Sequence, residues 1–157
     1  MVENIVRQIR TLLQNELPAK LDQIELERAD GVILEDIQSF FMQPGHKDAR
    51  IKYPNITILG EATTATNALS HRRELRHRIS LWVILREVST DSDLAPAKLW
   101  RYVEAIERIL ASNPTLGGKV INSEVTNHVY FNKGREEFIR IAALIIEILE
   151  KPPTSNY

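Results

Sequence analysis

The chain has 157 residues, of which 43% are hydrophobic and 26% are charged, so it is long enough to form one domain with a core of ordinary size. A net charge of −1 gives no overall attraction to nucleic acid or to an anionic membrane, and the absence of cysteine excludes disulfides and thiolate zinc sites. We expect no signal peptide and no membrane span, because charges interrupt both the N-terminal segment and the apolar run 139–149.

The first 50 residues predict two helices joined by a less regular segment. Apolar residues recur at three- and four-residue spacing over 2–17, and Pro18 is expected to end this helix, because a residue that precedes proline disfavours the α conformation. Residues 19–31 predict a short strand or an irregular connection that closes in a turn at its Asp-Gly end. A short helix is expected from Glu35 to Met42, followed by a loop over 43–50.

The next segment predicts a hairpin. Residues 55–60, NITILG, read as a strand, and the small polar residues 61–70 read as a loop or a mobile segment. The longest strand signal is 71–88, HRRELRHRISLWVILREV, which begins basic and ends apolar. Because strands are typically about 5–6 residues long, we expect residues 70–78 to project as an arm and residues 79–88 to lie in the sheet.

Read with a period of two, this long strand has one apolar and one mixed face. The first carries Leu75, His77, Ile79, Leu81, Val83 and Leu85, and the second carries Arg76, Arg78, Ser80, Trp82, Ile84 and Arg86.

The C-terminal third predicts a helix and two strands. The helix begins at a cap within 91–93 and ends near Ala111, before Asn113-Pro114 and a Gly117-Gly118 turn. Alternation over 119–131 predicts a strand, with a hairpin turn at 132–134. Its expected inner side chains are Ile121, Val125, Val129 and Phe131.

Residues 135–150 fit either a helix or a central strand. The preceding strand and turn favour the strand. The order of elements then predicts an α+β fold, with an antiparallel four-stranded sheet, two main helices packed on one face, and an extended loop or arm. We expect residues 1–150 to form one domain and 151–157 to be an exposed C-terminal tail.

A search for catalytic and ligand-binding patterns favours no enzyme class. The four histidines are His46, His71, His77 and His128, and the two that lie closest in sequence are about 20 Å apart along a strand. The sequence contains no HExxH, GxSxG, Walker or GxGxxG pattern. We therefore predict no catalytic, cofactor-binding or metal-binding residue, and no cofactor.

The unusual local feature is the arginine cluster at the start of the long strand. Two interpretations stay open: a solvated strand end interleaved with Glu74, or a surface for phosphates or an acidic partner, which guanidinium groups bind through two parallel bonds. An apolar Trp on the same strand face would mark a subunit interface. The candidate interface or DNA-contacting residues are Arg72, Arg73, Arg76, Arg78, Trp82 and Arg86.

The order of these elements, together with several local strings, resembles the tail terminator (tail-completion) proteins of tailed bacteriophages, of the lambda tail-terminator type. The strings are LPAKLDQIE, PNITILGEA, HRISLWVIL, LWRYVEAIERILASNP and IAALIIEILE, and they cover most of the chain. Related neck proteins that join head and tail share this resemblance. The segment 61–78 has no counterpart that can be matched residue by residue.

The resemblance implies a structural virion protein rather than an enzyme. Such proteins form homo-oligomeric rings, commonly hexamers, on the last ring of the tail tube, end its polymerisation and present a surface to the neck or head-completion protein. DNA later passes through the lumen, and the location is the tail–neck junction of a virion made in the bacterial cytoplasm. A neck or head–tail connector protein of the same virion, and a small nucleic-acid-binding module, remain as alternatives.

Overall fold

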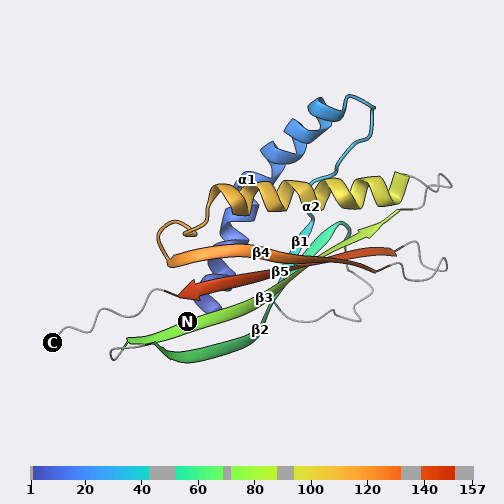
Figure 1. Ribbon diagram of the computed structural model, residues 1–157. Coiled ribbons are helices and arrows are strands. Elements are labelled where there is room, and N and C mark those ends of the chain that lie inside the picture. The colour runs from blue at the N-terminus through green and yellow to red at the C-terminus, as the bar shows by residue number, and fades with distance from the viewer. Residues whose placement is uncertain (1, 43–51, 69–71, 88–93, 132–138, 151–157) are drawn as a thin grey trace.

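The computed structural model describes residues 2–42, 52–68, 72–87, 94–131 and 139–150 (Figure 1). Two helices and five strands follow one another along the chain. They are α1 (Val2–Arg28), β1 (Ser39–Phe41), β2 (Asn55–Ala68), β3 (Arg72–Arg86), α2 (Leu94–Ser112), β4 (Val120–Phe131) and β5 (Ile139–Glu150).

Helix α1 continues through Pro18, so the prediction that it ends there is wrong, as is the strand or irregular connection predicted for 19–28. A proline inside a helix costs about 3 kcal/mol, because it removes a backbone N–H and crowds the preceding turn. Leu21 and Ile24, both fully buried, lie beyond it, and burial of each contributes about 2 kcal/mol. The core contacts of the last turns thus outweigh the local penalty, and Pro18 itself faces solvent.

The chain leaves α1 through a turn and then runs extended. Gly31 has a φ of 78°, which suits a residue without a Cβ. The N–H of Leu34 donates to Glu25 Oε1 at 2.6 Å, and the hydroxyl of Tyr102 donates to the carbonyl of Glu35, so both helices hold this segment. The helix predicted over 35–42 is therefore wrong: β1 pairs in parallel with the first three residues of β2.

Strands β2 and β3 form a hairpin much longer than the predicted one. Every residue from Arg72 to Arg78 has a partner on β2, and the bulge at Glu61 shifts the register by one residue. The loop predicted over 61–68 is wrong, because the backbone groups of this threonine-rich stretch pair with the first half of β3. The predicted strand over 71–88 is confirmed from Arg72 to Arg86. The prediction that residues 70–78 project from the sheet is wrong for Leu75–Arg78, because these residues also pair with β5.

The C-terminal elements agree with the sequence more closely. Helix α2 and strands β4 and β5 are confirmed, and β4 and β5 pair in antiparallel orientation. The predicted inner face of β4 is wrong in part, because β4 has bulges at Ile121 and Thr126. Each bulge reverses the alternation, so Val125 pairs with Ile146 on one face of the sheet while Phe131 pairs with Ile141 on the other.

The α+β class is confirmed, but the sheet has five strands in the order β1-β2-β3-β5-β4, and β1 makes it mixed rather than purely antiparallel. Both helices lie on one face. Gly60, Ile79 and Ile146 share that face by register; Gly60 faces Val2 of α1, and Ile146 lines a cavity with Leu110 of α2. Buried residues of both helices and of these strands form one core.

Four predictions fall outside the described residues: the loop over 43–50, the helix cap within 91–93, the turn over 132–134 and the exposed tail over 151–157. Neither of the two described helices combines the length and apolarity that a membrane crossing requires.

Candidate assembly surfaces

The face of the sheet opposite the helices, here called the outer face, carries most of the residues singled out from sequence. Period-two alternation on β3 puts Arg76, Arg78, Trp82 and Arg86 there, as predicted. The three arginines are exposed, but Arg86 is eight residues, or about 26 Å, from Arg78 by strand rise. Arg86 therefore shares the outer face with the arginine cluster but is too far along the strand to belong to it. Arg72 and Arg73 extend the strand at the hairpin tip, opposite Ala68 and Asn67.

The hairpin end of the sheet, Ala62–Ala68 of β2 and Arg72–Arg78 of β3, is here called the arm, and acidic side chains accompany its arginines. Arg76 donates to Glu74 at 2.9 Å, with both side chains partly exposed, and Glu147 lies opposite Arg78 in the register of β3 and β5. Exposed ion pairs of this kind contribute little to stability, but they reduce the local positive potential. The arm is thus a mixed-charge surface rather than a continuous basic patch.

Trp82 has intramolecular partners on the outer face. Its ring stacks on Phe131 of β4, with 5.3 Å between centroids and 12° between planes. Ala143 of β5 lies opposite Trp82 in register, and its small side chain leaves room for the two rings to meet across that strand. Six half-buried apolar side chains share this face with them: Leu59, Ile84, Val129, Ile141, Ile145 and Leu149.

A polar chain anchors the indole at the bulge of β2. Trp82 Nε1 donates to Ser80 Oγ at 2.9 Å, and Ser80 Oγ donates to Glu61 Oε1 at 2.5 Å. Ser80 is 2% exposed, so these bonds satisfy a hydroxyl that is buried beside an apolar cluster. The bulge that interrupts the β2–β3 register thus places the carboxylate where it accepts this bond.

Sequence reasoning missed a second polar cluster, at the base of the arm on the helix-covered face. His77 is 2% exposed, its Nδ1 lies 2.8 Å from Thr63 Oγ1, and its Nε2 lies 2.8 Å from Glu150 Oε2. The cluster joins β2, β3 and β5 near the hairpin end of the sheet, where His77 pairs with a residue on each neighbouring strand. A histidine on an apolar strand face was the only sequence signal, since the other two residues come from strands whose register the sequence does not give.

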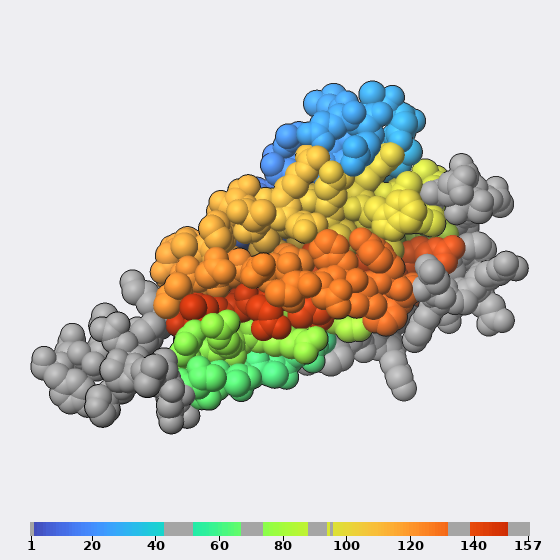
Figure 2. Space-filling view, viewed as in Figure 1, coloured from blue at the N-terminus to red at the C-terminus, as the bar shows by residue number. Residues whose placement is uncertain are grey.

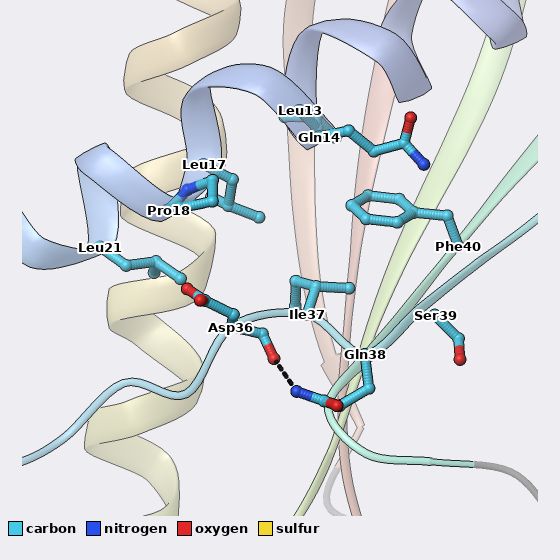
Figure 3. Close-up of a pocket in the computed structure, with 10 residues that line it drawn as sticks. All are labelled: Leu13, Gln14, Leu17, Pro18, Leu21, Asp36, Ile37, Gln38, Ser39 and Phe40. Atoms are coloured by element: carbon cyan, nitrogen blue, oxygen red, sulfur yellow. Dashed lines mark hydrogen bonds between the residues drawn. The ribbon is translucent and has the colours of Figure 1, made fainter.

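A groove of about 350 Å³ lies between α1 and the segment that leads into β1 (Figure 3). Leu13, Leu17 and Leu21 form its helical wall, and Ile37 and Phe40 form the opposite wall. Its described polar contact is internal, from Gln38 Nε2 to the carbonyl of Asp36 at 2.9 Å. The groove suits an apolar side chain, and its lining offers no acid–base pair.

Ion pairs join the C-terminal end of α1 to the middle and the last turns of α2. Arg101 donates two hydrogen bonds to the Asp30 carboxylate, and this interaction lowers the pKa of Asp30 from 3.8 to about 2. Arg108 pairs with Glu27 at 2.9 Å, and its hydrogen bond lowers the pKa of Glu27. These contacts hold the predicted Asp30-Gly31 turn against α2, and they account for the charged residues near the end of α1.

The sheet has two free edges in the described structure. Beyond Thr57, β2 pairs with β3 alone, and the edge of β4 away from β5 faces no described strand. Figure 2 shows β4 in orange on the near side of the molecule, below α2. Large apolar side chains are exposed along β4 and on α2: Ile121 at 48%, Tyr130 at 39% and Trp100 at 57%.

Among the described residues, no three His, Cys, Asp or Glu side chains are grouped so as to hold a metal ion. Neither the profiles of known protein families nor the sequences of curated proteins match this chain.

Proposed function

We propose that this chain is a structural subunit that assembles with copies of itself into a closed ring. The observation that supports it best is the arm, Ala62–Ala68 of β2 and Arg72–Arg78 of β3. Strand β5 pairs with Leu75–Arg78, so the edge of the arm that lacks a described partner strand is that of β2. Residues 61–66 are all exposed, and the backbone N–H and C=O groups on the side of β2 away from β3 have no partner among the described strands. A free strand edge is a template for pairing with another chain, and rings form when two different surfaces meet head to tail and the rotation closes.

The resemblance to tail terminators supplies the biological role in this proposal. The ring caps the phage tail tube, stops its polymerisation and offers the opposite surface to the neck. The α+β architecture with two helices on a sheet agrees with that family's expected fold. The mixed charge of the arm suits a ring that DNA traverses, because a strongly basic lumen would retain the polyanion.

Mass measurement of the native protein, followed by negative-stain images alone and with polymerising tail-tube protein of the same virion, tests the proposal. We expect rings in solution, or caps at tube ends and shorter tubes. A protein that stays monomeric and leaves tube length unchanged would overturn it.

The same preparation separates the two alternatives. A dodecameric ring that binds the portal side and not the tube would make the chain a neck connector. Salt-dependent DNA binding by the isolated chain, lost in Arg76→Ala/Arg78→Ala without any effect on ring assembly, would instead favour a nucleic-acid-binding module.

A further inference from the structure

The direction of the strands determines how two copies can join. Strand β2 is antiparallel to β3, β3 to β5, and β5 to β4. In this alternating series β2 and β5 run one way, and β3 and β4 run the other. The two strands with free edges, β2 and β4, therefore run in opposite directions at opposite ends of the antiparallel part of the sheet.

We infer that the arm of one subunit pairs through β2 with the free edge of β4 in the next subunit, so that one antiparallel sheet continues around the ring. Because β2 and β4 run in opposite directions, a second copy in the same orientation brings its β4 beside β2 in antiparallel register without being turned over. An odd number of antiparallel strands would give a parallel contact instead. This inference rests on the proposed ring and names the surfaces that close it.

Beyond the bulge at Glu61, the free edge of β2 lacks the features that normally prevent strand addition. From Ile58 to Ala68 its one charged residue is Glu61, and it contains no lysine or proline. Natural edge strands are usually protected by charge, proline, a bulge, shortness or a covering element. Strand β1 covers Asn55–Thr57 alone, so the stretch that remains free is uncharged beyond the bulge and rich in threonine.

The free edge of β4 complements this arm in side-chain size. Thr64 is level with Asn122 through β3 and β5, so a sheet continued in this way sets Ala62–Thr66 of one subunit beside the Val120–Glu124 end of β4 in the next. This end of β4 carries the exposed Ile121, whereas Ala62–Thr66 of β2 consists of alanine and threonine. Large side chains against small ones bury apolar area, while two arms paired with each other would bring only small side chains together. This contrast favours β4 over a second β2 as the partner.

Cysteine cross-linking tests the contact directly, because the chain contains no cysteine. Thr64 and Asn122 are both exposed and both lie on the outer face, and they are level with each other through Arg76 and Leu149, so a continuous sheet would bring them close. The double variant Thr64→Cys/Asn122→Cys is treated with a bismaleimide that spans about 8 Å, the reach of diagonal cross-strand neighbours. Thr64→Cys alone, Asn122→Cys alone and Thr64→Cys/Asp22→Cys, with Asp22 exposed on α1, are the controls.

We expect the double variant to give a covalent ladder on a denaturing gel that ends at the ring mass, while the three controls remain largely monomeric. Dimers from Thr64→Cys alone would mean that arm pairs with arm, and would overturn the inference. Native rings with no covalent ladder would overturn the inference and leave the proposed ring function intact. An unmodified protein that stays monomeric and also leaves tube length unchanged would overturn the ring function itself. Circular dichroism of each variant verifies the fold, which both exposed positions are expected to preserve.

Discussion

Removal of the Thr63 hydroxyl is expected to destabilise the hairpin end of the sheet, where Thr63 of β2 contacts His77 of β3. When a neutral His77 donates from Nε2 to the Glu150 carboxylate, its Nδ1 is an acceptor and the Thr63 hydroxyl donates to it. Thr63→Val preserves the shape and strand preference of the side chain but leaves that buried acceptor without this partner. Such a loss costs about 1–2 kcal/mol.

Thr64→Val is the matched control. Thr64 is the next residue on β2, it lies on the other face of the hairpin opposite Arg76, and it is exposed. Its replacement is expected to change the free energy of unfolding by less than about 0.5 kcal/mol. The same substitution on adjacent positions of one strand therefore isolates the bond to His77.

Urea unfolding followed by circular dichroism at fixed protein concentration measures both effects. With a denaturant slope of about 2 kcal/mol per M, Thr63→Val should lower the midpoint by about 0.5–1 M, and Thr64→Val should leave it nearly unchanged. In a His77→Phe background the cost of Thr63→Val should vanish, since the acceptor is gone. Equal shifts for the two valine variants, or a cost that persists without His77, would refute the reasoning.

Two further predictions concern the outer face and the helix ends. Trp82→Ala should destabilise the protein by about 2–3 kcal/mol, because it loses the stack on Phe131. Trp100→Ala, at a side chain that is 57% exposed, should change the free energy of unfolding by less than about 0.5 kcal/mol. Similar urea midpoints for the two variants would contradict this prediction. Because the folded pKa of Asp30 is lowered from 3.8 to about 2, its ion pair contributes stability above about pH 4 that is lost as the pH falls toward 2. Asp30→Asn should therefore narrow the difference between the unfolding midpoints at pH 7 and pH 3, and an unchanged difference would show that the pair does not contribute.

Elements with strong periodicity could be predicted from the sequence. The secondary structure of α2, β3 and β5 was predicted correctly from the apolar stripe of α2, the alternation of β3 and the hairpin that precedes β5. A helix or strand that buries one face repeats its apolar residues at the period of its own geometry. The assignment of Arg76, Trp82 and Arg86 to one face of β3 follows from the same rule. These predictions needed no knowledge of what packs against the element.

Elements that depend on a distant partner could not be predicted in this way. The local effect of Pro18 is unfavourable, and the helix persists because Leu21 and Ile24 reach a core built by other elements. Residues 61–68 resemble a loop by composition, and they are a strand because β3 offers them partners. The cluster of Thr63, His77 and Glu150 likewise requires the register of three strands.

The sequence by itself determined the α+β class, the types of α2, β3, β4 and β5, and the face on which the central arginines and Trp82 lie. The tertiary structure decided the length of α1, the existence of β1, the length of the arm and the identity of the two free edges. The physical reason is that side-chain periodicity is a local property of the chain, whereas backbone pairing and core burial are satisfied between segments far apart in it.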